Sequence, residues 1–182
     1  MSPSQYLVLE NLTKGFNKPC ILDLKMGTRM YGDFATEAKR KSQRKKSKRS
    51  TSLKLGIRFC GSQRFSSSQR SFETIDKYVG RNADETELKT LLQKFFTCRG
   101  GLRSEVICDV MKNVSQIRQT LIDLPEYRFY SSSLLIIYEG QPDPVSSYAE
   151  DKTDNSMDCE EFDQAISADN NKEIVKQIVL ES

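Results

Sequence analysis

The segment Pro19–Gly27 constrains this chain more than any other, because it is an apolar stretch that carries one acid and one base. Asp23 and Lys25 are two residues apart, and side chains with that spacing on a β-strand point to the same face. We therefore predict a strand that presents a carboxylate and an ammonium group together, with Ile21 packed beside them. Taken alone, the pair can equally be a solvated surface ion pair.

A strongly basic segment follows, with eight lysines and arginines between positions 39 and 49. We expect a helix over residues 35–49, capped by Asp33 or Thr36. At 100° per residue, the helix has two opposite faces: Lys39, Gln43 and Lys46 on one, and Lys41, Lys45 and Lys48 on the other. The first face offers two ammonium groups and an amide, the donors that a multiply phosphorylated ligand needs. A solvated basic helix or a nuclear-localisation-type run remains the alternative.

The composition excludes several classes of site. The 182 residues include no histidine, which removes Ser-His triads, histidine bases and most zinc sites. The five cysteines are odd in number and show no CxxC spacing, so we expect neither a metal site nor disulfides, and a reducing compartment. No segment reaches the roughly 18 apolar residues of a membrane span, and the first residues do not resemble a signal peptide. We expect a soluble protein of the cytoplasm and nucleus.

Charge divides the chain after Gly140. The net charge is +3, but eleven acidic residues and only three lysines follow Gly140. This asymmetry predicts a basic ligand-binding body over residues 1–140 and an acidic, partly disordered tail over residues 141–182.

Periodicity predicts the remaining elements. Apolar residues at helical spacing begin at Leu88 and again at Val106, and predict two core helices, the second over 103–123. Strands are expected at residues 6–10, 55–60, 74–79 and 128–138. A serine-rich turn is expected over 62–71, and a weak amphipathic helix over 166–180.

Four segments in order carry a resemblance to a known family. They are Leu-Glu-Asn-Leu-Thr from Leu9, Pro-Cys-x-Leu-Asp-Leu-Lys-Met-Gly-x-Arg from Pro19, the basic helix, and Tyr-x-Phe-Tyr-Ser-Ser-Ser-Leu-Leu-x-x-Tyr-x-Gly from Tyr127. Over residues 6–140 the chain resembles the inositol polyphosphate kinases, and among them the inositol hexakisphosphate kinases. The resemblance implies an α+β fold like the C-terminal lobe of protein kinases. That fold is a mainly antiparallel sheet with packed helices and an added basic helix that binds substrate.

The resemblance also implies roles for individual residues. The Glu10 carbonyl and the Leu12 N–H would meet the adenine edge of ATP, and Asp23 would accept hydrogen bonds from the ribose hydroxyls. Lys25 would reach the phosphates, act in catalysis and help to bind the substrate by holding the inositol phosphate in line with the γ-phosphate. The remaining roles are substrate binding for Lys39, Gln43 and Lys46, the metal–phosphate site for Ser133, and the adenine pocket for Leu134 or Leu135.

The implied chemistry is phosphoryl transfer from Mg-ATP to an inositol phosphate, with inositol hexakisphosphate giving a diphosphoinositol phosphate. Such reactions rest on positioning and charge neutralisation, so the lack of histidine is no obstacle. We expect a monomer with an inositol phosphate substrate and neither a membrane span nor a nucleic acid partner.

Two parts of the family pattern find no match here. An N-terminal lobe would precede Gln5, and Glu161-Phe162-Asp163 does not correspond to the Ile-Asp-Phe motif whose aspartate holds the metal. We therefore expect a fragment or a degenerate paralogue. The alternative function is a non-catalytic module that binds inositol phosphates, phosphoinositides or nucleic acid through the basic helix, with a steep salt dependence.

Overall fold

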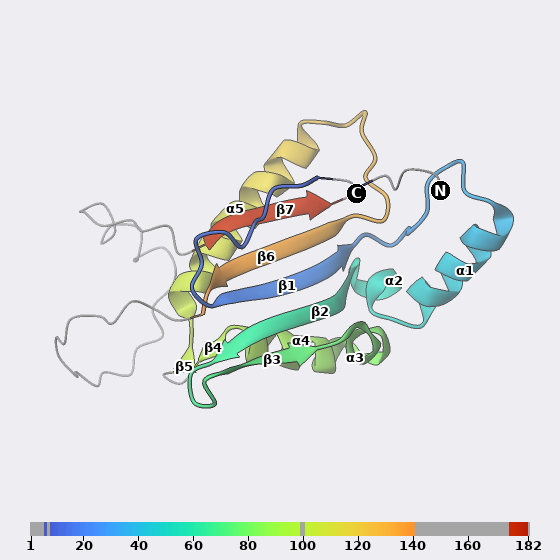
Figure 1. The fold of residues 1–182 in the computed structure, drawn as a ribbon. Helices are drawn as coiled ribbons and strands as arrows, with labels where there is room; N and C mark the ends of the chain where they lie inside the picture. Colours follow the sequence, from blue (N-terminus) through green and yellow to red (C-terminus); the bar gives the residue numbers. More distant parts are fainter. Residues whose placement is uncertain (1–5, 7, 99–100, 141–174, 182) are drawn as a thin grey trace, which may run out of the picture.

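The fold is built on one antiparallel sheet. The computed structural model describes residues 6, 8–98, 101–140 and 175–181. Five strands lie in the order β3-β2-β1-β6-β7, and each pairs antiparallel with its neighbours (Figure 1). Their bounds are β1 Pro19–Met26, β2 Ile57–Ser66, β3 Ser71–Ile75, β6 Ser133–Glu139 and β7 Val175–Glu181. The short strands β4 Thr97–Cys98 and β5 Gly101–Leu102 form a separate pair.

Helices lie against the sheet and beyond one end of it. The bounds are α1 Glu37–Lys48, α2 Ser52–Leu55, α3 Lys77–Asn82, α4 Glu85–Phe95 and α5 Ser104–Ile122. The long helix α5 runs along the sheet near β7, whereas α1 lies past the end of β1 (Figure 1). An antiparallel sheet with packed helices confirms the predicted α+β class.

The core lies on one face of β1. Cys20, Leu22 and Leu24 are buried, and they alternate with residues that are only half-buried. Helices α4 and α5 cover this face with Leu88, Phe95, Val106 and Val110. The phenol of Tyr138 donates to the Phe95 carbonyl (2.6 Å), so a buried hydroxyl is satisfied where α4 ends.

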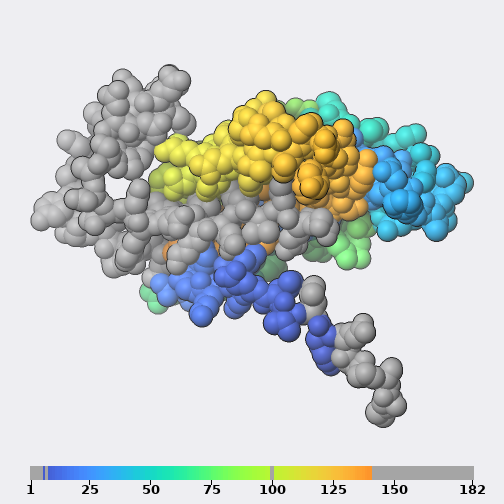
Figure 2. Space-filling view, turned by 90° about the horizontal axis from the view of Figure 1, so that it is seen from above, coloured from blue at the N-terminus to red at the C-terminus, as the bar shows by residue number. Residues whose placement is uncertain are grey.

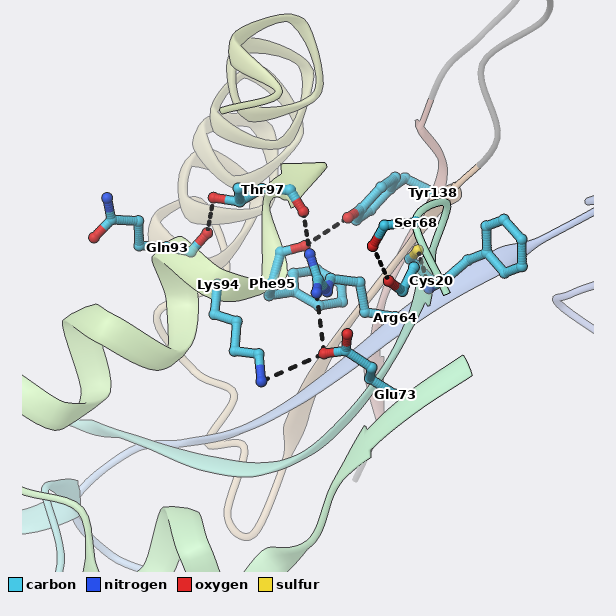
Figure 3. Close-up of polar contacts among 11 residues, drawn as sticks. Cys20, Arg64, Ser68, Glu73, Gln93, Lys94, Phe95, Thr97 and Tyr138 are labelled. Atoms are coloured by element: carbon cyan, nitrogen blue, oxygen red, sulfur yellow. Dashed lines mark hydrogen bonds and ion pairs between the residues drawn. The ribbon is translucent and has the colours of Figure 1, made fainter. Parts of the chain in front are cut away.

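A half-buried ion cluster ties α4 to the edge of the sheet (Figure 3). Arg64 of β2 donates to Glu73 of β3 (3.0 Å) and to the Thr97 carbonyl, and the Lys94 ammonium of α4 lies 3.3 Å from the same carboxylate. The hydrogen bond from Arg64 is the main reason that the pKa of Glu73 lies below its usual value.

Residues 27–56 form one long connection between adjacent strands. Met26 lies opposite Ile57, and just beyond that pair the Gly27 N–H donates to the Gly56 carbonyl (2.6 Å). Both glycines have a positive φ, +90° and +71°, which a residue with a Cβ rarely adopts. Helix α1 therefore lies within the long loop of the β1–β2 hairpin, and the hydrogen bond between Gly27 and Gly56 closes this loop at its base. Its N-cap is Thr36, whose Oγ1 accepts from the Lys39 N–H (3.3 Å), so of the two predicted caps Thr36 is confirmed.

Two predictions around β3 were wrong. The turn expected over 62–71 is partly strand, because β2 continues to Ser66 and its residues 62–66 pair with β3. The strand expected over 74–79 ends at Ile75, because Asp76 accepts from the N–H groups of Tyr78 and Val79 (2.8 and 3.2 Å) and starts α3.

Three further segments differ from the prediction. Tyr6 and residues 8–10 belong to no strand, and β6 begins at Ser133 instead of residue 128. Residues 175–180, predicted as helix, lie in β7, where the backbone pairs with β6. Residues 166–174 of that predicted helix fall outside the described residues. The boundary proposed after residue 140 stays a prediction, and residues 175–181 of the expected tail lie in the sheet. Among the described residues, no helix is long and apolar enough to cross a bilayer.

Candidate functional site

The second face of β1 carries the polar residues that the sequence singled out. Asp23 and Lys25 alternate with the buried core residues and therefore lie on the opposite face, as predicted. Across the β1–β6 pairing, Asp23 lies opposite Leu135 and Lys25 lies opposite Ser133. Cross-strand partners share a face, so these four residues form two adjacent rows.

Lys25 is held in place by the start of β6. Its Nζ donates to the carbonyl of Ser131 (3.0 Å) and to Oγ of Ser133 (2.9 Å). An ammonium group has three N–H donors, so one donor remains for a ligand. Ser133 is only 2% exposed, so its hydroxyl is a fixed acceptor for this lysine.

Asp23 carries an unsatisfied oxygen. Its Oδ1 is buried and finds no hydrogen-bond partner within the described part of the chain. A buried carboxylate oxygen without a donor is costly, and such groups in native proteins call for an explanation. A ligand hydroxyl is the kind of donor that would satisfy it.

Arg58 is the residue that the sequence reasoning missed. It lies on β2 directly opposite Lys25, is 8% exposed, and leaves Nη1 without a partner among the described residues. A guanidinium beside an ammonium concentrates positive charge on one row, which suits a phosphate. The sequence does contain one sign of this role, because Arg58 is a single cation between the apolar residues Ile57 and Phe59.

Cys60 lies close to the charged groups of Asp23, Lys25 and Arg58. It is the extra residue of a β-bulge, because Gly61 pairs with Asp23 and Phe59 pairs with Leu24. Burial raises the pKa of the Cys60 thiol, and the Asp23 charge adds to this. Arg58 and Lys25 act in the opposite direction, so all three charges lie within electrostatic reach of one sulfur atom.

The two leucines of the Ser-Ser-Leu-Leu segment face opposite sides of the sheet. Leu134 is 6% exposed and belongs to the core cluster. Leu135 is half-buried and lies beside Asp23 on the second face. Of the two candidates for an adenine pocket, only Leu135 is on the face that carries the charges.

Residues 8–18 lie on the opposite side of the molecule from α5 (Figure 2). The Glu139 carboxylate holds the end of this segment by accepting from the N–H groups of Asn17 and Lys18 (2.7 and 2.9 Å). Glu10 is exposed and Leu12 is half-buried. The Glu10 carbonyl and the Leu12 N–H have no backbone partner in the described ranges, and their role at the adenine edge stays a prediction.

The structure only partly separates the two faces of α1. Gln43 and Lys46 are half-buried, whereas Lys39 is exposed. The three lysines of the opposite face are all exposed: Lys41, Lys45 and Lys48. The predicted face is thus less solvated at two of its three positions.

A stack of alternating aromatic and cationic side chains joins α1 to the residues before β6. The Arg29 guanidinium lies 4.2 Å from the Tyr130 ring centroid and 4.9 Å from that of Tyr31. Arg44 of α1 lies 5.5 Å from the Tyr31 ring and donates to its hydroxyl (3.0 Å). Cation–π contacts of this kind orient side chains as well as stabilise them, so the position of α1 is coupled to the segment that holds Lys25.

The comparison with protein families agrees with this geometry. The family model "Inositol polyphosphate kinase" matches residues 6–177. The chain belongs to the inositol polyphosphate kinase family. It is 41% identical over 138 residues to inositol hexakisphosphate kinase 3 of Mus musculus, which covers 76% of this chain and 35% of the relative. Inositol hexakisphosphate kinase 2 of Homo sapiens is 41% identical over 155 residues, with coverages of 84% and 36%. The chain thus spans about a third of the length of these relatives.

Two solved structures share the fold. Inositol phosphate multikinase Ipk2 of S. cerevisiae, in complex with ADP and Mn²⁺, is 26% identical, with a TM-score of 0.66 over 97% of this chain and 71% of that one. Another inositol phosphate multikinase structure aligns with a TM-score of 0.60 at 24% identity, over 73% of this chain and 65% of that one.

The second face of β1 fits a nucleotide better than it fits a metal ion. The orphaned Asp23 Oδ1 matches the hydroxyl donors of a ribose. Within the described ranges, however, no three Asp, Glu, Cys or His side chains gather as ligands for a metal. The Ser133 hydroxyl already accepts from Lys25, and its role at a metal stays a prediction.

Proposed function

We propose that this chain carries the nucleotide- and acceptor-binding part of an ATP-dependent inositol phosphate kinase. Inositol hexakisphosphate is the proposed acceptor, and diphosphoinositol pentakisphosphate the product. The observation that carries the proposal is the pair of rows on the second face of β1, where an unsatisfied carboxylate oxygen of Asp23 adjoins the cations Lys25 and Arg58. Family membership and the relatives named as inositol hexakisphosphate kinases support it.

The spacing along β1 suits a nucleotide that lies along the strand. Residues two apart on a strand are separated by about 6.5–7 Å, so a sugar at Asp23 would bring its phosphates toward Lys25. Asp23 would accept from the ribose hydroxyls, while Leu135 beside it offers apolar surface for the base. The free peptide groups of Glu10 and Leu12 provide an acceptor and a donor for the adenine edge.

The acceptor would bind between Lys25 and the half-buried side of α1. Lys25 and Arg58 neutralise charge on the transferred phosphoryl group, and Gln43, Lys46 and Lys39 bind the phosphates of the inositol ring. The nucleophile of inositol hexakisphosphate is an ionised phosphate oxygen, so the reaction requires alignment and charge neutralisation more than a general base.

ATP with Mg²⁺ is the proposed cofactor. The ADP and Mn²⁺ bound in the Ipk2 structure support a nucleotide with a divalent cation. Such a cation neutralises charge on the phosphate oxygens of the nucleotide. Lys25 and Arg58 of this chain would add fixed positive charges that help to neutralise the same phosphate oxygens.

Calorimetric titration with inositol hexakisphosphate at physiological salt tests the acceptor site. Lys39→Ala/Lys46→Ala is compared with a matched control of equal charge on the other face, Lys41→Ala/Lys45→Ala. We expect one-site binding that the first pair weakens by at least tenfold and the control by less than about twofold, since hydrogen bonds to charged groups contribute about 1.5–3 kcal/mol each. Equal weakening by both pairs, with a steep dependence on salt, would instead indicate a non-catalytic anion-binding module.

A further inference from the structure

Ser131 has an unusual backbone conformation beside the ligand-binding face. Its φ is +62°, in the left-handed region, and among the described non-glycine residues only Arg70 shares a positive φ. Residues with a Cβ adopt this region rarely, and such outliers persist only where the surroundings fix them. The carbonyl of this same residue accepts the hydrogen bond from Lys25 Nζ (3.0 Å).

The chain is held on both sides of Ser131. Upstream, the Tyr130 hydroxyl accepts from Arg29 (3.0 Å), and the Arg29 guanidinium packs on the Tyr130 ring. Downstream, the Ser132 carbonyl accepts from the Met26 N–H (2.8 Å), and Ser132 is 2% exposed. With its neighbours fixed, Ser131 cannot relax to a negative φ without moving one of these contacts or its own carbonyl.

We infer that Ser131 is a positioning residue, whose left-handed backbone holds its carbonyl on Lys25 and fixes the ammonium group before any ligand binds. The inference rests on the proposed function, since it assigns a purpose to the placement of a phosphate-binding lysine. Lysine has a flexible four-carbon stem, so a ligand otherwise has to order it at an entropic cost. The carbonyl of Ser131 and the hydroxyl of Ser133 remove that cost in advance.

Two substitutions at the same position separate conformation from side-chain chemistry. Ser131→Gly accepts the left-handed backbone without a Cβ, whereas Ser131→Val strongly disfavours it. In calorimetric titrations of the full chain with inositol hexakisphosphate, we expect Ser131→Val to weaken binding about tenfold, the effect of losing one hydrogen bond to a charged group. Ser131→Gly should stay within about twofold of the wild type.

A double-mutant cycle with Lys25→Met distinguishes positioning from general destabilisation. In the Lys25→Met background, Ser131→Val should have no further effect on binding, because the group that it positions is gone. An equal loss in both backgrounds would overturn the inference and leave Ser131 a structural residue. Ser131→Thr, a milder β-branched change, replaces Ser131→Val in the cycle if thermal unfolding shows that the valine variant does not fold.

A ligand-free measurement keeps this inference separate from the proposed function. NMR of the ¹⁵N-labelled lysine ammonium groups should show a slowly exchanging Lys25 signal in the wild type and in Ser131→Gly. We expect that signal to be lost in Ser131→Val, and its persistence there would overturn the inference. If the wild type bound no inositol hexakisphosphate, the proposed function would fail while the ammonium signal still tested the role of Ser131.

Discussion

The two faces of β1 use alternate residues of one strand for different purposes. On one face, Cys20, Leu22 and Leu24 are 1%, 0% and 6% exposed and pack under α4 and α5. On the other face, Asp23 leaves a buried oxygen unsatisfied, and Lys25 keeps one donor free. The first face contributes apolar burial, which stabilises the fold. The second keeps polar groups that stability alone does not require, as sites that bind ligands do.

Because core residues and polar residues alternate along β1, substitutions at neighbouring positions should separate effects on folding stability from effects on ligand binding. A change on the core face should lower the free energy of unfolding, whereas a change on the opposite face should alter ligand affinity and leave folding nearly unchanged. The following predictions test that separation.

The largest effect is expected for Leu22→Ala. Leu22 is fully buried, and removing a buried leucine side chain costs about 2–5 kcal/mol through lost burial and the cavity that it leaves. Urea unfolding measures this loss. Ile21→Ala is the matched control on the half-buried face and should cost clearly less; an equal cost would contradict the assignment of the core to one side.

Lys25→Met should act on binding. Methionine keeps most of the apolar stem but removes the ammonium group, so we expect ten- to a hundredfold weaker binding of inositol hexakisphosphate, from the loss of about 1.5–3 kcal/mol. The free energy of unfolding should fall by only about 1 kcal/mol, less than for Leu22→Ala, because Lys25 is half-buried but the buried Ser133 hydroxyl loses its donor. A large fall in stability with unchanged affinity would reverse the roles given to the two faces.

A smaller and more diagnostic effect is expected for Asp23→Asn. The substitution removes a charge whose Oδ1 is buried and unsatisfied, so the free energy of unfolding should stay constant or rise slightly. Affinity for ATP, measured by titration, should fall about fivefold, since one charged acceptor is replaced by a neutral one. If Asp23 served the fold instead, stability would fall and nucleotide affinity would not.

The smallest effect concerns Glu73, in the ion cluster with Arg64 and Lys94 (Figure 3). The hydrogen bond from Arg64, with further help from Lys94, lowers the pKa of Glu73 in the folded state below its ordinary value of 4.5. A lowered folded pKa contributes stability above about pH 4.5 that is lost as the pH falls further. Glu73→Gln should make the free energy of unfolding less dependent on pH in this range, and the change should be less than about 1 kcal/mol.

Urea unfolding at several pH values measures this dependence. Glu126→Gln, in the segment between α5 and β6, is the exposed carboxylate control. The same acid-dependent loss in wild type and Glu73→Gln would show that other groups are responsible.

Much of the second face could be predicted from sequence because strand periodicity is strict. Two-residue spacing placed Asp23 and Lys25 together, and the serine–leucine segment resembled a known family closely enough to identify it. Arg58 was missed because its position depends on a register between β1 and β2 that includes a bulge. Register and bulges are set by tertiary pairing and are not local properties of the sequence.

Other errors came from local hydrogen bonds that compete with periodicity. The Asp76 side chain starts a helix where an apolar pattern predicted a strand. The serines of residues 62–71 predicted a turn, yet pairing with β3 over residues 62–66 satisfies the backbone there and extends β2. The left-handed Ser131 and the contacts around it come from segments far apart in the sequence, so no local pattern could have revealed them.

The closure of the β1–β2 hairpin by the Gly27–Gly56 hydrogen bond also affects how this fold can diversify. The sheet needs only that the ends of residues 27–56 meet, so the segment between them can be exchanged as one unit when the replacement keeps the contact between Arg29 and Tyr130. Under the proposed function, exchange of this segment among relatives, by recombination or in the laboratory, would change the acceptor while Asp23 and Lys25 stay on β1. Under the same proposal, recognition of the phosphate donor and of the acceptor can evolve at separate rates.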